Sequence, residues 1–139
     1  VDYAHNGIAL RHLLETLRAY EPTRLLLVFG CGGERDHKRR AEMGRVAAQM
    51  ADYSVVTSDN PRREDPRGII ADITEAMDAA GGAYEIIEDR GEAIRAAVRL
   101  TEAGDMLVVA GKGHETIQII GNESRHFDDR EELKKGRKL

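Results

Sequence analysis

Apolar segments of two kinds alternate along the chain, and their spacing separates strands from helices. Short uninterrupted apolar runs occupy residues 25–29, 53–57, 84–87 and 106–110, as in strands buried on both faces of a sheet. Between them, apolar residues recur every three or four positions, as on one helix face, over residues 10–17, 43–50, 69–77 and 94–101. This alternation predicts an α/β fold with a Rossmann-like, mostly parallel sheet and helices on both faces.

The two ends of the chain extend this pattern. Residues 1–4 are strand-like, and Asn6 is a suitable N-cap for the helix that follows. Near the other end, residues 116–120 form a further strand-like run shortly after Ala110. So short a connection cannot cross over to a parallel strand, so we predict one antiparallel strand near the C-terminus. A charged helical stretch, residues 131–139, completes what we predict to be one domain over residues 1–139.

Composition narrows the classes of function. The net charge is −4, which does not favour binding to nucleic acid. The apolar runs have the length of strands, so we expect no membrane partner. A single cysteine, Cys31, excludes an internal disulfide and favours the cytoplasm, and no Cys and His spacing suggests a metal site. Because the chain starts directly at a strand and without Met, we expect it to be a fragment of a longer protein.

Unusual loops follow the predicted strands, and the carboxyl ends of parallel strands meet at one edge of a sheet. These loops are residues 3–7, 30–36, 59–62 and 111–115. Ligands of open α/β sheets bind at this edge. The segment Asp59 to Arg62 offers a carboxylate, a carboxamide, a fixed turn and a guanidinium that can pair with a ligand carboxylate bidentately. The alternative is an ordinary turn with a solvated arginine.

The loop at residues 30–36 is rich in glycine, which permits close approach of the backbone to a ligand. It matches neither a Walker P-loop nor a dinucleotide fingerprint. Arg35 is its best candidate for contact with an anion, with a solvated arginine as the alternative. We expect residues 38–40, all basic, to form a solvated start of the next helix. Cys31 has no evident neighbouring base and is not expected to be a catalytic thiol.

The loop at residues 111–115 combines flexible backbone with a lysine, an imidazole and the Glu115 carboxylate, or else forms a hairpin with a polar tip. Across these loops, arginines and Asn60 could bind a carboxylate, whereas Asp59 and Glu115 could bind an ammonium group. A ligand with both groups is an amino acid. His5 either contributes to this edge or satisfies the backbone at the start of the first helix.

Four motifs, taken in order, resemble the C-terminal domain of the Mur ligases. They are DYAH at residues 2–5, FGCGGERD at 29–36, TSDNPR at 57–62 and AGKGHE at 110–115. The resemblance covers nearly the whole chain. Within the family, it is strongest to the ligases that add meso-diaminopimelate to UDP-N-acetylmuramoyl-L-alanyl-D-glutamate in peptidoglycan synthesis.

The resemblance implies an ATP-dependent acid–amino-acid ligase of three domains, in which this domain brings the amino acid and closes over ATP. ATP would phosphorylate the D-glutamate γ-carboxylate, and the incoming amine would attack the acyl phosphate. The other domains would hold most of the ATP, Mg²⁺ and UDP-sugar contacts, so we expect no catalytic residue in this domain and no activity from it alone. It also implies a cytoplasmic monomer that serves cell-wall biogenesis, cell shape and cell division.

Individual residues match the positions at which the family binds its ligands. Those matching the diaminopimelate site are Arg35, Asp59, Asn60, Pro61, Arg62, Gly111 and Glu115. Arg62 would take the far carboxylate of diaminopimelate, and lysine-adding relatives lack this arginine because lysine has no carboxylate there. Asp2 and His5 match residues near the nucleotide, although Asn6-Gly7-Ile8 departs from the Thr-Pro-Asp of many relatives.

Two alternatives stay open. One is a lysine-adding or other Mur-type amide ligase domain, which the role of Arg62 would distinguish. The other is a stand-alone amino-acid-binding module without catalysis, which a P-loop upstream in a longer reading frame would exclude.

Overall fold

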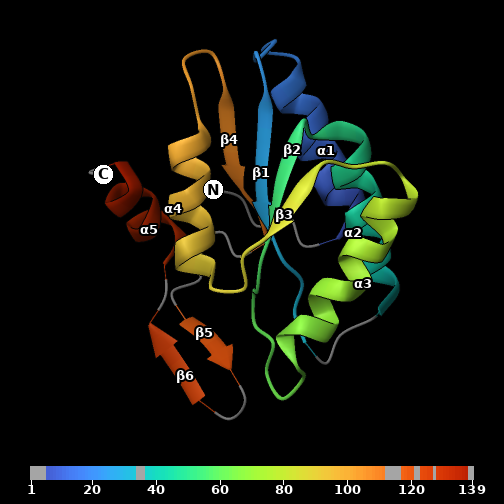
Figure 1. The fold of residues 1–139 in the computed structure, drawn as a ribbon, viewed down its shortest axis with the longest axis vertical. Coiled ribbons are helices and arrows are strands. Elements are labelled where there is room, and N and C mark those ends of the chain that lie inside the picture. The colour runs from blue at the N-terminus through green and yellow to red at the C-terminus, as the bar shows by residue number, and fades with distance from the viewer. Residues whose placement is uncertain (1–5, 34–36, 112–116, 121–122, 127, 138–139) are drawn as a thin grey trace.

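A four-stranded parallel sheet forms the centre of the molecule (Figure 1). The computed structural model describes residues 6–33, 37–111, 117–120, 123–126 and 128–137. The strands of the sheet lie in the order β3-β2-β1-β4. They are β1 (Leu25–Phe29), β2 (Tyr53–Val56), β3 (Tyr84–Ile86) and β4 (Met106–Val109). The mostly parallel sheet predicted from the apolar runs is therefore confirmed, while the strand predicted at residues 1–4 lies outside the described residues.

Helices cover both faces of this sheet, as predicted (Figure 1). One face packs against α1 (Gly7–Arg18), α2 (His37–Met50) and α3 (Pro66–Ala79). The other packs against α4 (Arg90–Leu100), which α5 (Asp129–Arg137) adjoins. Among the described helices, none is long and apolar enough to cross a membrane.

Successive side chains of β1 point to opposite faces of the sheet, and both faces are covered by helices. This explains why every residue of the strand is apolar. Leu25, Leu27 and Phe29 join the core beneath α1, α2 and α3, whereas Val28 joins the core beneath α4. All five residues of β1 are buried. Each large apolar side chain buried in this way stabilises the fold by about 1.5–3 kcal/mol relative to an exposed one. The central strand therefore anchors the positions of the loops at both of its ends.

The side chains of Asn6, Asp65 and Asp89 each cap the start of a helix. The Asn6 side chain accepts a hydrogen bond of 2.8 Å from the Ala9 amide, which confirms the cap predicted for α1. Asp65 caps α3, and Asp89 caps α4. Each cap satisfies one of the amides that the first turn of a helix leaves without an intrahelical partner. These caps fix where the chain turns from a loop into a helix near the carboxyl ends of the strands.

The C-terminal strand does not join the parallel sheet in the described part of the chain. Instead, β5 (Ile117–Ile120) pairs with β6 (Glu123–His126) in a separate antiparallel two-stranded sheet. The antiparallel strand predicted near the C-terminus is therefore not shown as part of the mostly parallel sheet; β5 is antiparallel to β6 instead. Strands joined by two residues pair with each other as a hairpin, and the polar sequence of β6 gave no signal of a strand. The hairpin projects from the end of the molecule at which the parallel strands finish (Figure 1).

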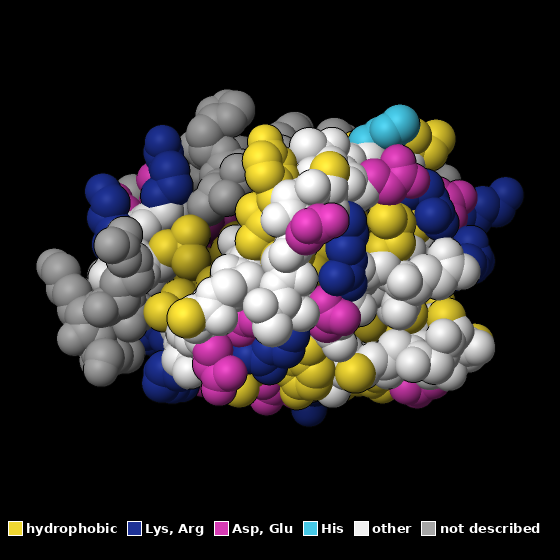
Figure 2. All heavy atoms as spheres, turned by 90° about the horizontal axis from the view of Figure 1, so that it is seen from above, with side chains coloured by type: hydrophobic (Ala, Val, Ile, Leu, Met, Phe, Trp, Pro, Cys, Tyr) yellow, Lys and Arg dark blue, Asp and Glu magenta, His cyan; other side chains and the backbone are white. Residues whose placement is uncertain are grey.

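At the opposite end of the sheet, the starts of the strands are held by arginine and aspartate side chains. Arg24 donates to Asp105 at 2.7 Å and to the carbonyl of Leu100 at 2.8 Å. This hydrogen bond holds the pKa of the Asp105 carboxyl below its ordinary value. Arg18 pairs with Asp52 at 2.9 Å. Viewed from this end, basic and acidic side chains lie next to each other on the surface (Figure 2).

Candidate functional site

The loop after β2 carries most of the predicted ligand-binding residues that the structure describes. Asp59, Asn60 and Pro61 are buried, and Arg62 is partly buried. The first residue after β2 still pairs with β1, because the Thr57 amide donates a hydrogen bond to the carbonyl of Phe29 at 2.9 Å. Burial of a carboxylate and a carboxamide in a loop requires nearby polar partners. The segment is therefore not a solvated turn.

The loop after β1 docks directly on the loop after β2 through backbone atoms. The Gly33 amide donates to the carbonyl of Asn60 at 2.7 Å. A Cβ atom at Gly33 would lie 1.8 Å from the carbonyl oxygen of Pro61, so only glycine permits this approach. The glycines predicted to let the backbone approach a ligand thus also allow two loops to pack on each other.

Arg62 turns back over both of these loops. Its backbone has a φ of 54°, in the left-handed region that residues other than glycine rarely adopt. Its Nη1 atom donates to the carbonyl of Gly33 at 3.0 Å and to that of Asn60 at 3.3 Å. Among the described residues, Nε and Nη2 of Arg62 donate no hydrogen bond. Nη1 thus holds the side chain against the two loops, and the expectation that the guanidinium binds a ligand carboxylate stays a prediction.

Gly111 follows β4 on the other side of β1. It is buried and has a φ of 103°, which favours glycine. Because β1 lies between β2 and β4, the loops after these three strands are neighbours at the carboxyl edge. The structure therefore brings Gly111 to the edge that carries residues 59–62. Of the other predicted site residues, Arg35, Glu115, Asp2 and His5 lie outside the described residues.

Arg40, expected at a solvated helix start, is buried instead. It exposes 1% of its side chain and forms a two-pronged pair with Glu64, both distances being 2.7 Å. It also donates to Asp72 of α3 at 2.8 Å. The carboxylates offset the unfavourable placement of a cation at the N-terminus of α2. Arg40 thus ties the loop after β2, which contains Glu64, to α2 and α3.

Arg90 is a second buried arginine, and it was not among the residues predicted from the sequence. It pairs with Asp129 through two hydrogen bonds, of 2.7 and 2.8 Å, and neither side chain is exposed. The same guanidinium donates to the carbonyls of Ser58 and Ala110, each at 3.2 Å. A signal was present in the sequence, because Arg90 precedes Ile94 by four positions and so lies on the apolar stripe of α4.

Cys31 lies in the loop after β1, but its environment does not favour a reactive thiol. Its side chain is 4% exposed and lies 3.6 Å from the sulfur of Met43. Burial, with a smaller effect of the Asp59 carboxylate, raises the pKa of the thiol to about 12. At neutral pH the group is protonated and therefore a poor nucleophile. Cys31 is part of the core beneath the candidate site.

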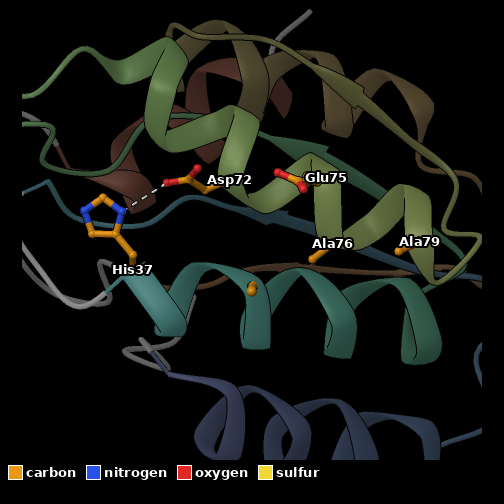
Figure 3. A pocket seen from close by; sticks show the side chains of 6 residues that line it. His37, Asp72, Glu75, Ala76 and Ala79 are labelled. Carbon is orange, nitrogen blue, oxygen red and sulfur yellow. Dashed lines mark ion pairs between the residues drawn. The ribbon is translucent and has the colours of Figure 1, made fainter.

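A hollow of about 330 Å³ lies elsewhere, between α2 and α3 (Figure 3). Its lining combines alanines with His37, Asp72 and Glu75. His37 and Asp72 point toward each other, and the Nδ1 atom of His37 lies 3.5 Å from Oδ2 of Asp72 (Figure 3). Of the predicted ligand-binding residues that the structure describes, none lines this hollow. The candidate site is therefore the carboxyl edge of the sheet and not this groove.

Comparison with known proteins identifies the family. Residues 1–113 match the family described as "Mur ligase, glutamate ligase domain". The chain belongs to the Mur ligase family. The family predicted from the four motifs is therefore confirmed.

Two curated proteins similar to this Mur ligase domain carry the same name. The chain is 51% identical over 131 residues to the UDP-N-acetylmuramoyl-L-alanyl-D-glutamate–2,6-diaminopimelate ligase of Syntrophomonas wolfei. It is 53% identical over 133 residues to the protein of the same name from Chlorobaculum tepidum. These matches include 94% of this chain but only 27% and 26% of the relatives. The chain thus spans about a quarter of their length.

Two solved structures are similar to this Mur ligase domain. A structure of a UDP-N-acetylmuramoyl-L-alanyl-D-glutamate–2,6-diaminopimelate ligase matches 96% of this chain with a TM-score of 0.91 and 42% identity, over 28% of that protein. A folylpolyglutamate synthase from Mycobacterium tuberculosis matches 80% of this chain with a TM-score of 0.60 and 22% identity, over 26% of that protein. The second likeness shows a shared fold alone. The roles of individual site residues remain predictions.

Proposed function

We propose that this chain is the amino-acid-binding domain of a ligase that adds meso-diaminopimelate to UDP-N-acetylmuramoyl-L-alanyl-D-glutamate. The names of the relatives support this reaction, and their greater length supports a larger enzyme of which this domain is one part. In that enzyme, ATP activates the D-glutamate γ-carboxylate as an acyl phosphate. The amine of the bound amino acid then attacks the acyl carbon and displaces phosphate.

The geometry of Arg62 is the observation on which the choice of amino acid rests. Its Nη1 atom is held by two backbone carbonyls, at 3.0 and 3.3 Å, and a guanidinium can still present a planar pair of donors to a carboxylate. Diaminopimelate has a second carboxylate for this pair to bind. Lysine would place an ammonium group there, and its repulsion by a guanidinium would select against it.

The remaining residues give the pocket its polarity. In the proposal, Asn60 and Arg35 help to bind carboxylates, whereas Asp59 and Glu115 take an ammonium group. Pro61 and Gly111 shape the backbone around the ligand. The domain needs no general base or nucleophile, because it contributes by holding the amine close to the acyl phosphate. Asp2 and His5 remain the candidates for contact with ATP.

Mg²⁺ is expected to assist the ATP chemistry of this family. Among the described residues, no group of three or more His, Cys, Asp or Glu side chains is arranged to hold a metal ion. We propose that the other domains of the ligase hold most of the contacts to Mg²⁺. The monomeric state and the cytoplasmic location also stay predictions.

The test is an assay of the full-length ligase with ATP, UDP-N-acetylmuramoyl-L-alanyl-D-glutamate and either meso-diaminopimelate or lysine. We expect efficient product formation with diaminopimelate and little with lysine. Preference for lysine would indicate a lysine-adding ligase, and no ligation of any amino acid would support a binding module. The domain alone should form no product. ATP-dependent ligation by this domain would contradict the proposal that the other domains hold ATP and the UDP-sugar.

A further inference from the structure

Arg90 joins two loops that the sheet itself does not connect. Its Nη1 donates to the carbonyl of Ser58 after β2, and its Nη2 donates to the carbonyl of Ala110 after β4, each at 3.2 Å. These strands do not pair, because β1 lies between them. A single buried guanidinium therefore spans the carboxyl edge of the sheet.

Each carbonyl that Arg90 binds belongs to the residue immediately before a proposed ligand-binding residue. Ser58 precedes Asp59, and Ala110 precedes Gly111. We infer that Arg90 is a positioning residue that sets the spacing of these two loops, and so the affinity for the amino acid. This inference rests on the proposed function. Arg90 touches neither the ligand nor the reacting atoms in this account.

Asp129 holds the guanidinium in the orientation that this role requires. It accepts from Nε at 2.7 Å and from Nη2 at 2.8 Å, which fixes the plane of the group. The exposed fraction of both side chains is 0%, so water cannot replace either partner. With the plane fixed, Nη1 points toward Ser58, and Nη2 also reaches Ala110. The start of α5 thereby contributes to the geometry of a loop pair in which it has no residue.

A change in the spacing of these loops should act on the amino acid more than on ATP. Binding and catalytic geometries tolerate displacements of only about 0.5 Å, and a shift of 1 Å can cost on the order of 100-fold. Lysine at position 90 keeps the charge but has no planar fork, so it cannot hold both carbonyls and Asp129 together. A residue needed only for folding would lower the fraction of active enzyme, and thus the apparent kcat, while KM stayed constant.

Arg95 provides a matched control. It lies on the same helix and also pairs with α5, through Glu132 at 2.5 Å. Within the described residues, its hydrogen bond is to Glu132 and not to a loop at the carboxyl edge. Arg95→Met therefore removes a link between α4 and α5 without removing a donor to Ser58 or Ala110.

The experiment compares Arg90→Lys, Asp129→Asn and Arg95→Met in the full-length ligase, with thermal unfolding as the check on folding. We expect Arg90→Lys to raise the KM for meso-diaminopimelate on the order of tenfold. Asp129→Asn should raise it about threefold, because the amide still accepts one hydrogen bond. The KM for ATP should change less than twofold in each, and Arg95→Met should leave both values unchanged.

An unchanged KM for diaminopimelate in Arg90→Lys, or an equal rise in Arg95→Met, would overturn the inference. If Arg90→Lys does not fold, Asp129→Asn decides by the same criterion. The proposed function fails separately, because the unmodified ligase would then not use diaminopimelate at all. If the unmodified ligase uses diaminopimelate, the KM measured for Arg90→Lys tests only the role of Arg90.

Discussion

Arginines hold both ends of the parallel sheet, but they are partly exposed at one end and buried at the other. At the amino end, Arg18 and Arg24 expose 37% and 39% of their side chains and donate to the last carbonyls of α2 and α4. At the carboxyl end, the side chains of Arg40 and Arg90 are 1% and 0% exposed, and these residues lie in the first turns of α2 and α4. The same residue type therefore meets different requirements at the two ends.

The difference lies in what replaces water around the guanidinium. An exposed arginine that loses a partner is solvated, so surface ion pairs contribute little to stability. A buried arginine that loses a partner leaves an uncompensated charge, which is costly. The buried arginines also contact the loops of the candidate site. We therefore expect changes at the carboxyl end to affect both stability and use of the amino acid, and changes at the amino end to affect stability alone.

Gly33→Ala should have the largest effect on stability, because the added methyl group would collide with the Pro61 carbonyl. The two loops would separate, at a cost of about 3 kcal/mol in the free energy of unfolding. The KM for diaminopimelate in the full-length ligase should rise at least about tenfold. Denaturant unfolding and steady-state kinetics measure the two effects.

Gly68→Ala is the control for this change. Gly68 lies in α3, and a Cβ atom there would meet nothing within 4 Å. Alanine should be neutral or stabilise the helix by up to about 1 kcal/mol. If Gly33→Ala is as harmless as Gly68→Ala, the docking of the two loops does not shape the site.

Arg40→Met should have an intermediate effect. It removes the hydrogen bonds to Glu64 and Asp72, whose side chains are 27% and 40% exposed and can be rehydrated. We expect a loss of about 2 kcal/mol in the free energy of unfolding and a smaller rise in the KM for diaminopimelate than with Gly33→Ala. Arg45→Met, at an exposed position of the same helix, should change neither quantity.

Asp105→Asn at the amino end should have the smallest effect, and one that depends on pH. Because Arg24 lowers the pKa of Asp105 in the folded state, the pair stabilises the fold above the unfolded pKa of about 3.9. That stabilisation is lost as the pH falls through the folded pKa. Thermal unfolding should therefore show a less stable variant at pH 7 and a vanishing difference in acid. A raised KM for diaminopimelate would contradict the distinction between the two ends.

The elements of the parallel sheet could be predicted because their signal is local. The apolar run at residues 25–29 needs burial on both faces, and β1 provides it. The hairpin could not be predicted in the same way, because β6 has the polar sequence ESRH and is specified by its pairing with β5. The motif at residues 57–62 located the candidate site through its place after a strand. The motif did not reveal that Gly33 packs against Pro61, because that contact joins two loops that are distant in sequence.

The buried arginines show how charge can conceal a buried position on a helix face. Arg40 lies three positions before Met43, and Arg90 lies four before Ile94, so both continue an apolar stripe. Position alone predicts burial, whereas residue type predicts exposure. Both arginines are buried, as their positions predict, because the carboxylates of Glu64 and Asp129 neutralise their charges. These partners are distant in sequence. Such partners are visible only after the fold is known.

The role of Arg62 in binding the second carboxylate of meso-diaminopimelate is the central claim, and one comparison tests it most directly. Arg62→Ala and the control Arg67→Ala, whose arginine is 81% exposed, are assayed in the full-length ligase with diaminopimelate and with lysine. We predict that Arg62→Ala lowers kcat/KM for diaminopimelate on the order of 100-fold without lowering it for lysine, and that Arg67→Ala changes neither. Unchanged kcat/KM for diaminopimelate in Arg62→Ala would contradict the account.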